Sequence, residues 1–184
     1  KQFTTIDIII KTIEDRKVVT YDEISDYFIN KLKMNDNIMY AANIKLMKRL
    51  IEVRKGEYIL KDTLKLNGDS LNKIREFIEI QLSGNEYVPM ISIIDYRGLP
   101  DIGYEWNPFL LQDIIEDNMP EYRFIEKHFK DRRYRCSSIL RNSSELTSIV
   151  DLIVYVLNYE YNDKEKMTIQ AIQQYLSLKN IIMN

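Results

Sequence analysis

Residues 18–60 constrain the fold of this chain more than any other part of its sequence. Thr20 can cap a helix, and Glu23 follows three residues later, which is the spacing of a capping box. A polar break at residues 35–37 comes next, followed by a second helical pattern and a short hairpin that turns at residues 55–56. We therefore expect helix, turn, helix and β-hairpin in this order.

The neighbouring patterns extend this arrangement. An amphipathic helix is expected over residues 4–15, because its isoleucines recur at the spacing of one buried face. Val18 and Val19 could add a short strand or simply pack. The helix after the polar break is expected over residues 37–52 and the hairpin over residues 53–60. The residues that this helix should bury are Tyr40, Ile44, Met47, Leu50 and Ile51.

The same order of elements recurs along the chain, which is the strongest indication of its architecture. An apolar helix precedes each second helix, and each second helix carries Ile and Tyr three residues apart: Ile24 and Tyr27, Ile93 and Tyr96, Ile172 and Tyr175. We expect three modules, over residues 1–62, 63–142 and 143–184. The third is expected to be partial, because no third helix or hairpin pattern follows. The start at Lys1 without a Met indicates a piece of a longer protein.

The second and third modules repeat the elements of the first. The third helix of the second module would be capped by Asn107, with Pro108 in its first turn. The expected elements are helices 70–82, 89–96 and 108–118, strands 121–129 and 134–140, and helices 144–159 and 168–182. The predicted fold is therefore mostly α with small β-hairpins.

This order of helix, turn, helix and basic hairpin resembles the winged helix-turn-helix superfamily. The resemblance is carried most fully by residues 18–60 and extends over most of the chain through element order alone, without pointing to a particular family. It implies tandem winged-helix-like modules that bind duplex DNA and catalyse no reaction. The chain departs from the pattern in the second module, whose third helix is acidic.

Charge is unevenly distributed along the chain. The formal net charge is −2 at pH 7, so the chain as a whole lacks the basic character of a nucleic-acid-binding protein. Basic residues nevertheless concentrate in residues 45–55 and 123–141, and the rest of the chain is acidic. This segregation indicates two basic patches on an acidic body.

The composition is typical of a globular protein of the cytoplasm. Apolar residues make up 45% of the chain and charged residues 29%. No run approaches the roughly 18 apolar residues that a membrane span requires. The single cysteine, Cys136, excludes an internal disulfide and fits a reducing compartment. The surplus of Ile, Lys, Asn and Tyr indicates an AT-rich bacterial genome.

The helix after the polar break is the best candidate for a DNA-reading helix. A helix in the major groove presents small or polar residues to the bases and Lys or Arg to the phosphates. A solvated helix face, or a surface for a protein partner, explains the same pattern. The candidate nucleic-acid-binding residues are Asn37, Ala41, Lys45, Lys48, Arg49, Arg54 and Lys55 in the first module, and Lys127, Lys130, Arg132, Arg133 and Arg135 in the wing of the second.

The third helix of the second module has the opposite charge. Its expected exposed positions are Gln112, Asp113, Glu116 and Asp117, and phosphates would repel these carboxylates. If this module binds nucleic acid, it therefore does so through its wing. The acidic helix near Asp113 and Glu116 would instead be where another protein domain docks or where the modules meet.

Patterns for catalysis and metal binding are lacking. His128 is the only histidine, and Cys136 could approach it across a hairpin, but no orienting acid or oxyanion loop can be named. No Cys/His cluster suggests zinc, and the five glycines are scattered singly rather than gathered in a phosphate loop. We therefore expect no enzymatic activity, no metal and no cofactor.

Besides a regulatory or specificity segment attached to a catalytic domain elsewhere in a longer protein, two functions remain open at this point. The first is a non-enzymatic DNA-binding region of a larger bacterial protein, which uses the third helix of the first module and the basic wings. The second is a protein-interaction or oligomerisation module of a larger regulatory or multi-domain protein. In either case no membrane contact is expected.

Overall fold

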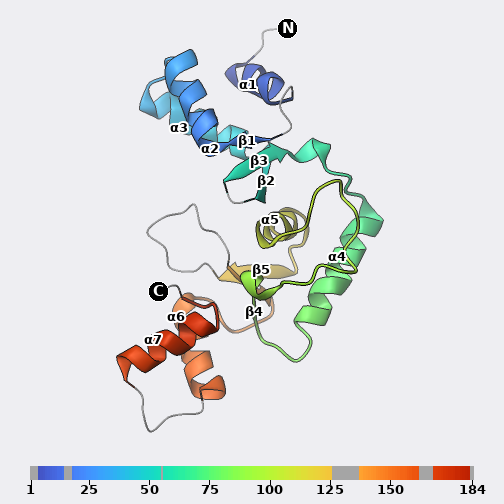
Figure 1. Cartoon of the computed structure of the whole chain (residues 1–184), viewed down its shortest axis with the longest axis vertical. Coiled ribbons are helices and arrows are strands. Elements are labelled where there is room, and N and C mark those ends of the chain that lie inside the picture. The colour runs from blue at the N-terminus through green and yellow to red at the C-terminus, as the bar shows by residue number, and fades with distance from the viewer. Residues whose placement is uncertain (1–3, 15–17, 55, 126–136, 162–167, 183–184) are drawn as a thin grey trace.

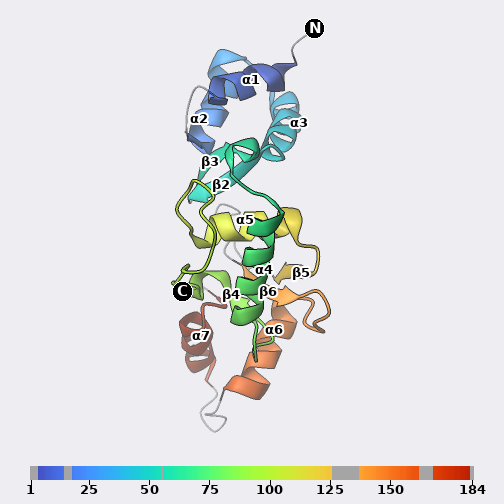
Figure 2. The ribbon, with the colours of Figure 1, turned by 90° about the vertical axis from the view of Figure 1, so that its right-hand side faces the viewer.

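The computed structural model describes residues 4–14, 18–54, 56–125, 137–161 and 168–182. The elements are stacked along one long axis, with the first module at one end and the third at the other (Figure 1). The second module lies between them, and the same order is visible after a quarter turn about the long axis (Figure 2).

The first module forms three helical segments and a small sheet. Its three strands pair antiparallel in the order β1-β3-β2. The elements are α1 (Thr5–Glu14), β1 (Val19–Thr20), α2 (Tyr21–Asp26) with a π-helical continuation η1 (Tyr27–Lys31), α3 (Asp36–Met47), β2 (Leu50–Arg54) and β3 (Glu57–Leu60), followed by the short helix η2 (Lys61–Thr63). Val19 is thus part of a short strand, one of the two outcomes that the sequence left open.

The start of α2 follows from local chemistry. The Thr20 hydroxyl accepts a hydrogen bond from the Glu23 backbone N–H at 3.2 Å, and the Glu23 carboxylate accepts one from the Thr20 backbone N–H at 2.8 Å. These two bonds satisfy orphan donors at the helix start reciprocally. The predicted capping box is therefore confirmed.

Helix α3 is shorter and turned differently than its sequence pattern predicts. It ends at Met47, and Leu50 and Ile51 belong to β2. Tyr40 and Ile44 were expected in the core but are 68% and 44% exposed. Instead, the helix buries Ala42 and Leu46, which lie on one face at i, i+4 spacing. The expected end of the helix was wrong because Leu50 and Ile51 pair in a strand, which β-branched Ile51 and Val53 favour.

The second module repeats the order of the first. Its strands pair antiparallel in the order β4-β6-β5, so that in both sheets the last strand lies between the other two. The elements are α4 (Gly68–Gln81), β4 (Val88–Pro89), the 3₁₀ turn η3 (Met90–Ser92), α5 (Pro108–Asn118), β5 (Tyr122–Ile125) and β6 (Ser138–Arg141).

The helix expected over residues 89–96 does not form. Pro89 and Ile93 both have extended backbone angles, and a single 3₁₀ turn connects them. The Met90 backbone N–H donates to the Ser137 carbonyl at 2.9 Å, so pairing with the chain beside β6 continues past the strand. Proline and β-branched isoleucine both favour this extended backbone over a helix.

Helix α5 lies between the two sheets (Figure 1). Ile51, Val53 and Ile59 of the β2–β3 hairpin belong to the same buried cluster as Ile74 of α4 and Ile114 of α5. The first module has a second, separate cluster around α1 and α3. The hairpin of the first module therefore completes the core of the second.

The third module is a helical pair. It consists of α6 (Ile149–Tyr155) with a π-helical continuation η4 (Val156–Glu160), and α7 (Ile169–Leu178). Helix α6 begins later than residue 144, because Ser148 caps it and Asp151 completes a capping box. The pair is joined to the second module at Tyr87, whose hydroxyl lies 3.3 Å from the Glu160 carboxylate. No helix in the described part of the chain is long and apolar enough to cross a membrane.

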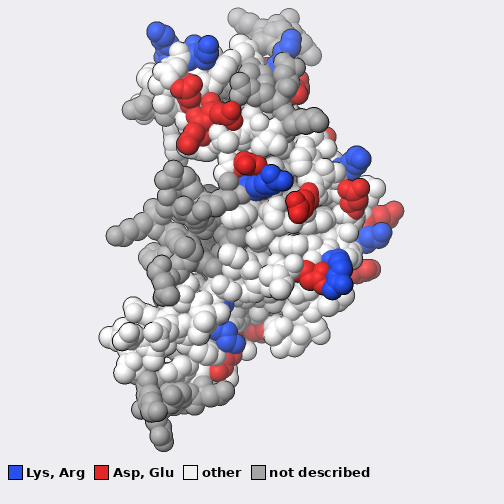
Figure 3. Space-filling model, viewed as in Figure 1, with Lys and Arg blue, Asp and Glu red and all other residues white. Residues whose placement is uncertain are grey.

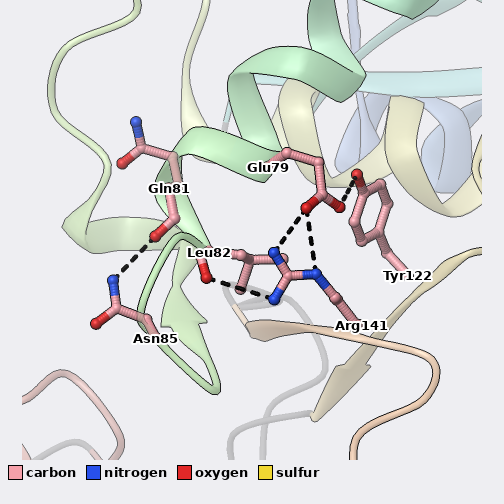
Figure 4. A network of polar contacts seen from close by, with 6 residues as sticks. All are labelled: Glu79, Gln81, Leu82, Asn85, Tyr122 and Arg141. Carbon is pink, nitrogen blue, oxygen red and sulfur yellow. Dashed lines mark hydrogen bonds and ion pairs between the residues drawn. The ribbon is translucent and has the colours of Figure 1, made fainter.

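A polar network fastens α4 to the sheet of the second module (Figure 4). The Glu79 carboxylate accepts hydrogen bonds from the Tyr122 hydroxyl at 2.8 Å and from Arg141 Nη2 at 2.6 Å. Arg141 Nη1 also lies 3.4 Å from the Leu82 carbonyl at the end of α4. The bonds from Arg141, and then the bond from Tyr122, lower the pKa of Glu79.

Tyr122→Phe should lower the free energy of unfolding by about 1 kcal/mol, because it removes the hydrogen bond from the Tyr122 hydroxyl to the charged Glu79 carboxylate. The loss is modest because the Glu79 side chain remains partly in contact with water. Urea denaturation followed by circular dichroism measures this change. Tyr104→Phe is a matched control, because the Tyr104 hydroxyl has no hydrogen bond to a described residue. Equal effects of the two substitutions would show that the Tyr122 hydroxyl contributes nothing specific.

Candidate nucleic-acid interface

The candidate interface is centred on the exposed face of α3. The Asn35 side chain caps this helix by accepting a hydrogen bond from the Ile38 backbone N–H at 3.0 Å. The cap fixes where the helix begins, and the burial of Ala42 and Leu46 fixes which residues face outward. The sequence-predicted residues on the exposed face are Asn37, Ala41, Lys45 and Lys48.

Lys45 and Lys48 carry the positive charge of this face. Both side chains are exposed, and neither forms a hydrogen bond or ion pair with a residue that the structure describes. Lys45 lies in the last turn of α3 and Lys48, three residues later, caps its end, so their ammonium groups can reach the same side of the helix. Nothing in the described structure neutralises them.

The two arginines of the predicted interface are placed differently. Arg49 lies beyond the end of α3, and its Nη2 is 2.9 Å from Asp62 Oδ2. Arg54, at the end of β2, has carboxylate oxygens of Glu57 and Glu105 at 4.0 and 3.9 Å. These ion pairs are exposed and weak, so a phosphate could replace the carboxylates. Because of the nearby carboxylates, the net positive charge around the two arginines is smaller than the sequence suggests. Lys55 lies outside the described residues.

Apolar side chains share this face with the lysines. Ile38, Tyr40 and Ile44 are each more than two-fifths exposed. Two of them, Tyr40 and Ile44, were expected to be buried, so this property of the surface was missed. The buried residues Ala42 and Leu46 have the same i, i+4 spacing as Tyr40 and Ile44. This spacing was the signal in the sequence that could have identified the buried face of the helix.

Helix α5 cannot serve as a second reader helix. Gln112, expected to be exposed, is 2% exposed, and its side-chain carbonyl accepts a hydrogen bond from the Ser137 N–H at 3.1 Å. Asp113, also expected to be exposed, accepts one from the Glu52 N–H of β2 at 2.9 Å. Both expectations were wrong, because each residue faces a sheet. The acidic helix was expected either to dock another protein or to lie where the modules meet. Asp113 lies at the contact of the first and second modules, because it binds the Glu52 N–H.

The contact between β2 and α5 concentrates negative charge. Burial first, and then the nearby carboxylates of Glu116, Glu52 and Asp117, raise the pKa of the Asp113 carboxyl to about 7, against the lowering effect of the hydrogen bond from the Glu52 N–H. Lys61 is paired with Asp117 at 2.5 Å on the exposed side of this contact. Glu116 and Asp117 are exposed, as expected.

The basic wing predicted for the second module lies outside the described residues. This applies to Lys127, Lys130, Arg132, Arg133 and Arg135, and also to His128 and Cys136. Two arginines of the same basic window, at its ends, do lie in the described part. Arg123 donates to the carbonyls of Ser144 and Leu146, and Arg141 is bound to Glu79. Both therefore hold the fold together rather than presenting free charge.

Comparisons with known proteins were made for the whole chain. No family model, curated protein or solved structure matches it. The interface therefore has to be judged on its own chemistry. Among the described residues, no three or more His, Cys, Asp or Glu side chains are placed to hold a metal ion.

Proposed function

We propose that this chain is a non-enzymatic DNA-binding region of a larger bacterial protein, with α3 of the first module in the major groove. The observation that carries this proposal is the pair Lys45 and Lys48, exposed on α3 without a partner among the described residues. Tandem winged-helix modules are supported by the recurrence of a helix, a short strand, a further helix and two paired strands, with the last strand in the middle of both sheets, although a 3₁₀ turn replaces the second helix in the second module.

The composition of the α3 face suits a groove. Ala41 is small, so the helix backbone can approach base edges closely, and the Asn37 amide can both donate and accept hydrogen bonds there. Ile44 can contact a thymine methyl group. Lys45 and Lys48 follow toward the end of the helix, where they would reach phosphates and set its position on the duplex.

The first module would be the reader, and the second would support it. Helix α5 is covered on one side by β2 and on the other by the sheet of its own module, so it cannot enter a groove. We propose that any phosphate contacts of the second module come from its basic wing, and that Arg54 and Lys55 add to those of Lys45 and Lys48 in the first.

A protein-interaction function is the alternative. The exposed Ile38, Tyr40 and Ile44 on α3 favour it, because a helix that docks a protein buries such side chains. A chain that binds only protein through this face would have no affinity for duplex DNA, even at low salt.

Lys45→Gln combined with Lys48→Gln should weaken binding to a random-sequence DNA duplex. Each phosphate contact contributes about 0.9 to the slope of log K against log salt concentration, so the slope should become shallower by roughly 2. Fluorescence anisotropy over a series of salt concentrations measures both the affinity and the slope.

Lys65→Gln combined with Lys73→Gln is the matched control, because it removes two exposed lysines from outside the first module. The control should bind DNA more tightly than the Lys45 and Lys48 double variant and should keep a steeper slope. No binding by the unmodified chain at low salt, or the same loss in both double variants, would overturn the proposal.

A further inference from the structure

A groove separates α1 from α2 on the first module. Its volume is about 470 Å³, within the size range of pockets that take a ligand or a few side chains. Ile9 and Ile13 of α1, together with Val19 and Ile24, form its apolar floor. The exposed lining is mainly apolar, so the groove favours an apolar occupant.

The rim of the groove is acidic. Acidic side chains gather over α2 (Figure 3), and the lining includes Asp22, Glu23 and Asp26. Glu23 is held in the capping box, whereas Asp22 and Asp26 are exposed one turn apart, roughly 6 Å along the helix axis. Among the described lining residues, Lys31 is the one cation. A cationic occupant with an apolar face therefore complements this groove.

Helix α3 of the same chain has this chemistry. Its exposed face combines Ile38, Tyr40 and Ile44 with Lys45 and Lys48, which are roughly 4.5 Å apart along the axis. Figure 2 shows α2 and α3 on opposite sides of the first module. The helix of one molecule therefore cannot reach its own groove.

We propose that α3 of one copy of this chain docks into the α1–α2 groove of a second copy. The apolar side chains of α3 would cover the isoleucine floor, and Lys45 and Lys48 would lie along Asp22 and Asp26. This is a helix-in-groove contact in which charge sets the orientation. Because it joins two different surfaces, the contact can repeat from copy to copy.

Self-association would compete with DNA for α3. The inference goes beyond the proposed function and does not depend on it, because the groove takes no part in DNA binding. Substitutions in the groove should therefore abolish self-association without weakening the affinity for DNA. This difference keeps the two proposals separately testable.

Charge reversal gives a direct test by sedimentation velocity over a series of protein concentrations. The groove variant carries Asp22→Lys and Asp26→Lys, and the helix variant carries Lys45→Glu and Lys48→Glu. The unmodified chain should associate as its concentration rises, and less so at high salt. Each variant alone should associate at least tenfold more weakly, because like charges then meet.

Mixing the two variants should restore association, because each then offers the charge that the other lacks. Circular dichroism checks that both are folded, and Asp22→Asn with Asp26→Asn serves as a milder groove variant if the reversal disturbs α2. An unmodified chain that stays monomeric at all concentrations, or a mixture of folded variants that does not associate, would overturn the proposal. A cationic segment of another protein would then be the better occupant.

Discussion

Replacing Asp113 with Asn should stabilise the chain at pH 8 and remove much of its pH dependence between pH 5 and pH 8. The reason is the position of this carboxyl group at the contact of β2 with α5, where burial and three neighbouring carboxylates raise its pKa to about 7. An Asn side chain can still accept the hydrogen bond from the Glu52 N–H, but it carries no charge to bury.

The sign follows from linkage between protonation and folding. In the unfolded chain an Asp carboxyl has a pKa near 3.9. Between about pH 4 and pH 7 the unfolded state loses this proton while the folded state keeps it, so the stability falls as the pH rises. Above about pH 7 the full cost of burying the charged carboxylate is present, on the order of 4 kcal/mol. The lowered pKa values of Glu79 and Glu121 act in the opposite direction, in acid below this range.

Urea denaturation at pH 5 and at pH 8 measures the effect. The difference in free energy of unfolding between Asp113→Asn and the unmodified chain should grow with pH. Taking this difference also cancels any contribution from the histidine, which both chains contain. Asp69→Asn removes an exposed carboxylate of α4 and should leave the pH dependence unchanged. An Asp113→Asn variant as pH-dependent as the unmodified chain would contradict the prediction.

Ile51→Ala in the first module should destabilise the second module by about 2–5 kcal/mol, the usual cost of removing so much buried side chain. Ile51 is 2% exposed and lies in the cluster that is built around α4 and α5. A cavity at this position therefore removes contacts from the core of the second module. The effect should be visible far along the sequence from the substitution.

Trp106, the single tryptophan, reports on the second module. Its indole N–H donates to the Pro100 carbonyl at 2.7 Å, and its ring packs against the same cluster. Its fluorescence should lose its native signal at a lower urea concentration in Ile51→Ala. Leu46→Ala removes a side chain of the same size from the other cluster of the first module and should shift the Trp106 signal less. Equal shifts, or no shift with Ile51→Ala, would argue against a shared core.

Local capping signals in the sequence predicted the starts of two helices, α2 and α5, but not those expected at residues 89 and 144. Thr20 with Glu23, and Asn107 followed by Pro108, begin helices where expected, because each cap is a short-range hydrogen-bond pattern. The hairpin between β2 and β3 also forms where Gly56 was expected to turn, and Gly56 has a φ of +74°. These features depend on neighbours within a few residues, so one sequence is enough to identify them.

Features that depend on distant packing were predicted less well. The exposed positions of α3 were only partly identified, because Tyr40 and Ile44 match one helical face and Ala42 and Leu46 match another. Asp113 looks like a solvated acid in sequence, and its burial depends on β2, which is far away along the chain. Arg49 was assigned to DNA, but its partner Asp62 follows the hairpin. Charge and spacing do not reveal such partners.

The position of α5 between two sheets affects how this architecture could be divided. A chain cut after residue 62 would carry Ile51, Val53 and Ile59 on a bare hairpin, with the helix that covers them removed. Water would then contact apolar surface that the whole chain hides. The boundary expected at residue 62 is therefore not a boundary of the folded structure. The smallest portion that recombination could transfer intact contains residues 1–142.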